Sequence, residues 1–183
     1  MRKEIKLAGF GGQGIILMGI VLAKAAGYYE GQEIAQTQSY GPEARGGACR
    51  AEVVISDGPI DYIKTLDPDI FVAMSQLAFD RYVHDMNPDT TKVFVDETLV
   101  VNLPDNFRFL YRIPATGLAE KKCHNRMVAN TVMLTVMVEM TNVVSIDALR
   151  SAISEQFDPK LRDLNLGALE MALDYCKEKG SNR

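Results

Sequence analysis

The segment "EIKLAGFGGQGIILMGIVLAKAAGYY", Glu4 to Tyr29, contains the turn that decides the fold. Its first seven residues, Glu4–Phe10, have partly alternating apolar side chains and predict a β-strand. From Gln13 to Tyr29, apolar residues recur on all sides over a helical length, which predicts a helix packed against a sheet. Between the two, "GFGGQG" (Gly9–Gly14) matches G-x-G-x-x-G, a tight turn that exposes helix N–H groups to an anion. The segment therefore predicts a Rossmann-like strand–turn–helix unit.

The rest of the chain alternates predicted strands and helices. The strand at Cys49–Ser56 is closed by the turn Asp57–Pro59, which indicates a hairpin-like antiparallel element, and the apolar run Asp69–Ser75 is typical of a central parallel strand. The other strands are predicted at Glu33–Gln38, Lys92–Glu97 and Phe107–Pro114. Helices are predicted at Gln76–Met86, Leu118–Lys122, Met127–Thr141, Ser145–Gln156 and Leu161–Lys179. Ser145 is expected to be the N-cap of its helix, and Gly180 to end the last one.

This order predicts an α/β fold, a three-layer α/β/α Rossmann-like sandwich. The sheet is expected to be mostly parallel with an antiparallel element, and the C-terminal part helical. No repeat or linker interrupts the chain, so residues 1–183 are expected to form a single domain.

Composition excludes several classes of function. The net charge of −4 and the absence of a basic run argue against nucleic-acid binding. The N-terminus lacks the long apolar region of a signal peptide, and the most apolar stretch, Met127–Met140, is too short to cross a bilayer. We therefore expect a cytoplasmic protein without a membrane or nucleic-acid partner.

The cysteines and histidines do not form a catalytic or metal-binding pattern. Cys49, Cys123 and Cys176 are far apart and lack a CxxC pair, so alone they cannot hold an iron–sulfur cluster or a structural zinc. Their odd number fits a reducing compartment, and we expect all three to be buried. His84 and His124 have no partner at useful spacing and are expected at the surface. No catalytic residue and no metal ligand is assigned.

The glycine turn lacks the second half of a nicotinamide-binding pattern. Such folds usually place an acid about 20 residues on, at the end of the second strand, to hold the ribose. Here that strand ends in Gln36–Ser39, and Glu33 stands at its beginning. Three interpretations stay open: a turn that is merely tight, a contact to an anion or to a partner's cofactor, and NAD binding. Gln13 favours a functional role, because its amide is expected at the mouth of the turn.

A second loop, "SYGPEARGG" (Ser39–Gly47), follows the predicted second strand. In a doubly wound sheet the loops after strands one and two emerge side by side at the carboxyl edge, where ligands bind. Arg45 offers a planar cation suited to phosphate or carboxylate, and Glu43 is expected to orient it, to reach across an interface, or to form a local surface pair. The candidate cofactor-binding residues are Gly11, Gly12, Gln13 and Gly14 of the first loop and Ser39, Tyr40, Gly41, Glu43, Arg45 and Gly46 of the second.

The predicted helix Met127–Thr141 is apolar around most of its circumference and carries a single charge. Such a helix is buried, either in the core of this chain or against another subunit, and the core is favoured. Asn125 and Asn130 are interpreted as helix caps or buried hydrogen-bonding residues, with a role in the site as the alternative.

The two loops together resemble the gamma subunit of the 2-oxoacid:ferredoxin oxidoreductases. "ISDGPID" (Ile55–Asp61) and "PATGLAEKKCHNRMVANTVML" (Pro114–Leu134) also look like segments of that family, so the resemblance covers nearly the whole chain. One departure is "NTVMLTVM", where the family often has a Leu-Gly step; this puts the register of that helix in doubt.

The resemblance implies an enzyme of several chains that oxidatively decarboxylates pyruvate, 2-oxoglutarate, a branched-chain 2-oxoacid or indolepyruvate. It implies alpha and beta subunits as partners, with or without a ferredoxin-like delta subunit, and ferredoxin or a similar electron acceptor. Thiamine pyrophosphate, Mg²⁺, [4Fe-4S] clusters and coenzyme A are then expected on the assembled complex, and none of them on this chain alone. The chain is expected to be inactive by itself. Its expected role is to complete the cavity near the cofactor and coenzyme A. Overall resemblance favours 2-oxoglutarate or a branched-chain acid. The alternatives are a free-standing NAD-type dehydrogenase and a non-catalytic nucleotide-binding module.

Overall fold

A six-stranded mixed sheet forms the centre of the protein. The computed structural model describes residues 1–40 and 47–180. Within them the strand order is β2-β3-β1-β4-β5-β6, and β3 runs against the other five. The strands are β1 Arg2–Phe10, β2 Glu33–Ser39, β3 Ala48–Ser56, β4 Ile70–Ala73, β5 Lys92–Asp96 and β6 Phe109–Ile113. The predicted α/β class, with a mostly parallel sheet and an antiparallel N-terminal element, is confirmed.

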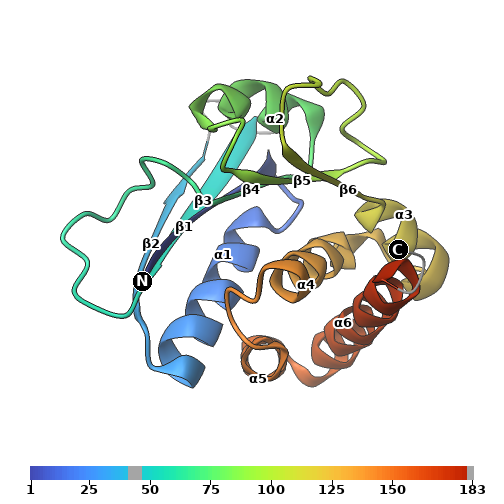
Figure 1. Cartoon of the computed structure of the whole chain (residues 1–183). Coiled ribbons are helices and arrows are strands. Elements are labelled where there is room, and N and C mark those ends of the chain that lie inside the picture. Colours follow the sequence, from blue (N-terminus) through green and yellow to red (C-terminus); the bar gives the residue numbers. More distant parts are fainter. Residues whose placement is uncertain (41–46, 181–183) are drawn as a thin grey trace.

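Helices cover both faces of the sheet (Figure 1). One face is covered by α2, Gln76–Tyr82, which continues as a 3₁₀ turn at Val83–Asp85. The other face carries the larger layer, and each face has its own cluster of buried apolar residues. The larger layer consists of α1 Ile15–Lys24 with a π-helical extension Ala25–Tyr29, α3 Ala115–Cys123, a 3₁₀ turn Arg126–Val128, α4 Ala129–Thr141, α5 Ile146–Gln156 and α6 Pro159–Gly180.

The most apolar helix is enclosed by the chain itself. All residues of α4 from Ala129 to Val138 are buried, because α4 packs against α1, α3, α5 and α6. The prediction that this segment belongs to the core is therefore confirmed. Met127, which precedes α4, is 78% exposed, and the last residues of the segment, Glu139–Thr141, are exposed or partly buried.

Several helix boundaries differ from the sequence prediction. Helix α1 begins at Ile15 and not at Gln13, because Gly14 adopts a left-handed conformation and serves as N-cap. Helix α3 begins at Ala115, three residues before the predicted start. Ser145 caps α5 as predicted, by accepting a hydrogen bond from the Ala148 amide.

The C-terminal helix is longer than predicted at both ends. It begins at Pro159, which is tolerated there because the first residues of a helix need no backbone donor. Gly180, predicted as the stop, is still part of the helix.

The position of β3 corrects the expected doubly wound order. β3 pairs with β1 along nine residues, from Arg2 opposite Ser56 to Phe10 opposite Ala48, and with β2 on its other side. Strands β1 and β2 are therefore parallel but not adjacent. This arrangement leaves β2 at the edge of the sheet.

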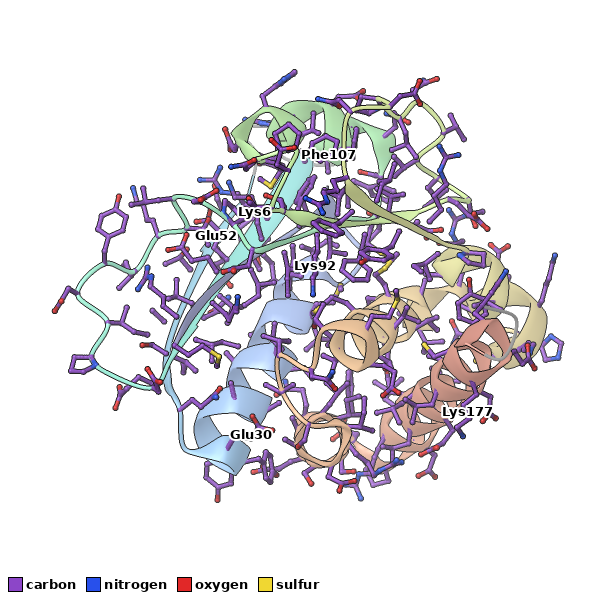
Figure 2. All side chains as sticks on the ribbon, in the orientation of Figure 1. Lys6, Glu30, Glu52, Lys92, Phe107 and Lys177 are labelled. Carbon is purple, nitrogen blue, oxygen red and sulfur yellow. The ribbon has the colours of Figure 1, made fainter. Side chains whose placement is uncertain are left out.

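A buried polar cluster, which we call the Glu52 cluster, lies on the α2 side of the sheet. Lys6, Glu52 and Thr37 stand opposite one another on β1, β3 and β2. The Lys6 Nζ lies 3.6 Å from Glu52 Oε1 and 3.0 Å from Asp85 Oδ2. Thr37 and Thr65 each donate a hydrogen bond to Glu52, at 3.2 and 2.8 Å. Figure 2 shows Lys6 and Glu52 side by side, so the cluster joins three strands and the segment after β3.

Replacing Glu52 with alanine is expected to destabilise the fold strongly. The change leaves Lys6 buried with only Asp85 as a counter-charge, and breaking a buried ion pair costs about 3–5 kcal/mol. Urea unfolding followed by circular dichroism measures the loss. The control is Asp174→Ala, which removes an exposed carboxylate beside Lys177 and should cost less than about 1 kcal/mol. Equal losses for the two variants would contradict the structural role of Glu52.

Candidate functional site at the carboxyl edge of the sheet

The glycine turn after β1 has a conformation that only glycine adopts readily. Gly12 and Gly14 have φ angles of 99° and 74°. A Cβ atom at Gly14 would also clash with Asn130 Nδ2, so α4 approaches the backbone closely here. Gly11, in contrast, faces open space. The turn is therefore packed on one side and accessible on the other.

The side chain of Gln13 ties two strand ends together. Its Oε1 accepts a hydrogen bond from the Phe10 amide at 2.8 Å, and its Nε2 donates to the Met74 carbonyl oxygen at 2.7 Å. The amide was expected at the mouth of the turn, and Gln13 does line the cavity there. Both amide atoms bond the backbone, one at the end of β1 and the other just after β4. Gln13 holds the turn in place.

The two glycine-rich loops lie at the same edge of the sheet. The Gly11 amide donates to the carbonyl oxygen of Gly47, the last residue of the second loop, at 3.3 Å. Ser39 ends β2 opposite Arg50, and Tyr40 is 67% exposed. The shared edge is thus confirmed at the described ends of the loops. Gly41, Pro42, Glu43, Ala44, Arg45 and Gly46 lie outside the described residues, and the binding roles assigned to the ten candidates stay predictions.

A cavity of about 180 Å³ opens beside the first loop. It is bounded by the ends of β1 and β4 and by the beginnings of α3 and α4. Its lining consists of Phe10, Gly12, Gln13, Met74, Thr116, Arg126, Met127 and Ala129. Of these, only Gly12 and Gln13 were candidates from the sequence.

Helix α1 begins at this edge without a side-chain cap, and the positive end of a helix dipole attracts anions. The first amides of α3 are already bonded, that of Thr116 to the Asp96 carboxylate and that of Gly117 to the Thr98 hydroxyl. Asn125 caps the 3₁₀ turn before α4 by accepting from the Met127 amide at 2.9 Å, which confirms its predicted capping role. Arg126 adds a cation to the rim. The edge suits a phosphate or carboxylate group.

Asn130 and Asp96 position these helix ends. Asn130 is 6% exposed, and its Nδ2 lies 3.4 Å from the Gly14 carbonyl oxygen, so the buried hydrogen-bonding role predicted for it is confirmed. Asp96 is fully buried, and its carboxylate accepts hydrogen bonds from the amide and hydroxyl of Thr116 and from the Thr98 amide. Asp96 was not among the residues predicted from the sequence, although an acid at the end of an apolar strand was a usable signal.

The thiols are not placed for nucleophilic chemistry. Burial raises the pKa of Cys49 and Cys123, and burial with the nearby Glu139 raises the pKa of Cys176 to about 11. All three are therefore protonated near neutral pH. Cys49 is buried as predicted, but Cys123 and Cys176 are only half-buried, so that part of the prediction is wrong. His84 and His124 are exposed, as predicted.

Residues 1–40 and 47–180 contain no group of three His, Cys, Asp or Glu side chains placed to hold a metal ion. Within the same ranges, every helix is too short or too polar to cross a membrane.

The fold and the glycine-turn edge agree with one protein family. Residues 4–175 match the family model described as pyruvate ferredoxin/flavodoxin oxidoreductase, and the chain belongs to this family. It is 46% identical over 180 residues to the 2-oxoglutarate synthase subunit KorC of Methanocaldococcus jannaschii, covering 97% of this chain and 96% of the relative.

A solved structure identifies the type of subunit. The gamma subunit of a keto/oxoacid ferredoxin oxidoreductase from Geobacter sulfurreducens superposes with a TM-score of 0.85 at 37% identity, covering 95% of both chains. The chain is thus a gamma subunit of a 2-oxoacid:ferredoxin oxidoreductase, as its two loops predicted.

In some relatives the same fold is part of a longer polypeptide. A 2-oxoglutarate:ferredoxin oxidoreductase from Magnetococcus marinus, solved with 2-oxoglutarate, coenzyme A and succinyl-CoA bound, matches 97% of this chain but only 31% of its own (TM-score 0.84, 25% identity). The ketoisovalerate oxidoreductase subunit VorA of Methanothermobacter marburgensis, 34% identical, matches 96% of this chain and 37% of its own. The gamma fold therefore also occurs within longer chains.

Replacing Gly14 with alanine is expected to destabilise the protein by about 1–3 kcal/mol, because alanine is strained at a positive φ and its Cβ would clash with Asn130. Gly11→Ala, in the same turn but facing open space, is the matched control and should leave the free energy of unfolding within about 0.5 kcal/mol. Chemical denaturation measures both. Similar stabilities for the two variants would contradict the close approach of α4 to the turn.

Proposed function

We propose that the chain is the gamma subunit of a 2-oxoglutarate:ferredoxin oxidoreductase, which converts 2-oxoglutarate and coenzyme A to succinyl-CoA and CO₂ and passes two electrons to ferredoxin. The observation that carries the choice of substrate is the graded identity to the relatives. Identity is 46% to a 2-oxoglutarate synthase subunit, 34% to a ketoisovalerate oxidoreductase subunit and 32% to a pyruvate synthase subunit.

The cavity at the carboxyl edge supports a site shared between chains. Its volume of about 180 Å³ lies below the roughly 300–1,000 Å³ of sites that enclose a whole small-molecule ligand. One wall is built here, from the glycine turn, Thr116, Arg126 and Met127. The remaining walls then belong to another subunit. This chain completes the cavity where cofactor and coenzyme A meet, and bound thiamine pyrophosphate supplies the electron sink for decarboxylation.

Within that shared cavity, each part of this edge has a distinct task. The open side of the turn, Gly11 and Gly12, lets a ligand approach the backbone, and the uncapped start of α1 with Arg126 attracts its phosphate groups. Gln13, Gly14 and Asp96 keep these groups in place. We assign the phosphate- and carboxylate-binding role of the second loop to Arg45, and Ser39, Tyr40, Gly41, Glu43 and Gly46 stay candidate binding residues of the same loop.

The cofactors of electron transfer are assigned to the partners. Scattered thiols with raised pKa do not fit a [4Fe-4S] ligand set, which needs several thiolates around one cluster. The clusters and the Mg²⁺ that accompanies thiamine pyrophosphate then belong to the alpha, beta or delta subunits. The compartment proposed for the enzyme is the cytoplasm.

The alternative of a free-standing NAD-type dehydrogenase has less support. β3 occupies the place beside β1 that the ribose-binding second strand takes in a dinucleotide fold. Strand β2 also ends without an acid, in Gln38 and Ser39. Binding of NADH by the isolated chain, measured by fluorescence titration, would revive this alternative.

Co-purification and substrate comparison test the proposal. The chain is co-expressed with the subunits encoded beside it, and the complex is assayed with coenzyme A and a low-potential dye. We expect 2-oxoglutarate to give a kcat/KM about tenfold or more above pyruvate and 2-oxoisovalerate, and the isolated chain to be inactive. A preference for another 2-oxoacid would overturn the proposed substrate. Activity of the isolated chain would overturn the proposal that the site is shared between subunits.

Arg45→Ala tests the second loop within the assembled enzyme. Losing a charge-assisted hydrogen bond of about 1.5–3 kcal/mol is expected to lower kcat/KM for coenzyme A about tenfold or more. Arg150→Ala removes an arginine from α5, where it pairs with Glu170 in the helical layer, and should leave the kinetics unchanged. Subunit stoichiometry is checked by native mass spectrometry. Wild-type kinetics in an intact Arg45→Ala complex would refute the assignment.

A further inference from the structure

The segment between β3 and β4, Asp57–Asp69, presents apolar side chains to solvent; we call it the anchored loop. Tyr62, Ile63 and Leu66 are 47%, 52% and 71% exposed. Three large apolar residues thus stand open to water within five positions of the chain. Clusters of this kind mark surfaces that another molecule covers.

The anchored loop is held to the sheet by hydrogen bonds to side chains of β1 and β3. The Glu4 carboxylate accepts hydrogen bonds from the amides of Leu66 and Asp67, at 2.6 and 3.1 Å. Thr65 donates to Glu52, which links the loop to the Glu52 cluster. Arg2 donates to the Tyr62 carbonyl oxygen at 2.9 Å. The exposed side chains are therefore presented on a fixed backbone, so a partner that covers them loses little conformational entropy.

Strand β2 adds an open sheet edge to the same flank. It is seven residues long, it pairs with β3 on one side, and its single charged residue, Glu33, stands at its beginning. Exposed edges are usually protected by lysine, proline or a bulge, and an unprotected edge accepts a further strand. Thr37 of β2 and Thr65 of the anchored loop both bond Glu52, so the edge strand and the loop lie on one flank of the sheet.

Charge distinguishes the two edges of the sheet. On the β2 flank the exposed acids Glu33, Asp57, Asp61 and Asp67 outnumber the exposed cations Arg2 and Lys64. The opposite edge, β6, has the exposed cations Arg108 and Arg112. A basic segment is therefore attracted to the β2 flank and repelled by the β6 edge.

We propose that the β2 edge and the anchored loop form the docking surface for another subunit of the same enzyme, which contributes an extended, basic and partly apolar segment. The segment pairs with β2 as a seventh strand and covers Tyr62, Ile63 and Leu66. The inference rests on the proposed function, which requires a partner. To that function it adds the place where the partner docks. Strand β2 ends at Ser39, at the edge where the glycine turn lies, so a partner docked along β2 reaches the candidate site.

A double substitution in the loop tests the apolar contact. Ile63→Asp with Leu66→Asp leaves the buried anchors in place, whereas Leu161→Asp, at an exposed leucine of α6, is the matched control. Each chain is co-expressed with a tagged partner subunit, and the amount retained is measured after affinity and size-exclusion chromatography. We expect the retained amount of the double variant to be at least about tenfold lower than that of the wild type. The control should be retained in the same amount as the wild type. Circular dichroism melting of the free chains shows whether both are folded.

Hydrogen exchange tests the pairing of a partner strand with β2, and charge reversal tests the basic character of that strand. On assembly, amides of residues 33–39 and 57–69 should gain protection. Asp61→Lys should slow association several-fold, whereas Asp105→Lys, in the exposed loop before β6, should not. Retention of the folded double variant at the wild-type level, or unchanged exchange along β2, overturns the docking surface even if the wild-type complex oxidises 2-oxoglutarate. A wild-type chain that joins no partner overturns this inference together with the proposed function.

Discussion

The antiparallel pairing of β3 with both β1 and β2 is the constraint on which the rest of the structure depends. The nine-residue ladder with β1 places Ala48 opposite Phe10, and this register brings Gly47 within hydrogen-bonding distance of Gly11. The same strand separates β2 from β1 and leaves β2 at the edge. One strand thus joins the two glycine-rich loops at one rim and opens the flank of the sheet on which we place the partner.

The carboxyl edge is rigid although it encloses little space. Gln13 links the ends of β1 and β4, Asn130 contacts the carbonyl oxygen of Gly14, and Asp96 holds the beginning of α3. These buried bonds set the positions of helix ends, and the carboxylate of Asp96 is already bonded to Thr98 and Thr116. A rigid wall beside the uncapped start of α1 suits a subunit that completes a site whose reacting groups are carried by its partners.

Local patterns in the sequence were sufficient for the elements and for the family. The apolar runs at Asp69–Ser75 and Met127–Thr141 predicted a buried strand and a buried helix, because burial on all sides needs apolar residues on all sides. Ser145 and Asn125 were correctly assigned as caps, since capping acts over two or three residues. The signals failed where partners are distant in the chain: Gln13 bonds Met74, and Asp96 bonds Thr116.

The α/β class, the glycine turn, the second loop and membership in the oxidoreductase family could be read from the amino-acid sequence, because each depends on residues close together in the chain. The place of β3, the burial of Lys6 with Glu52, and the exposure of Met127, Ile63 and Leu66 became visible in the folded protein. The physical reason is that strand order and burial follow from pairing and packing between distant segments. A charged residue in a strand carries no local sign of whether water or a counter-ion will face it.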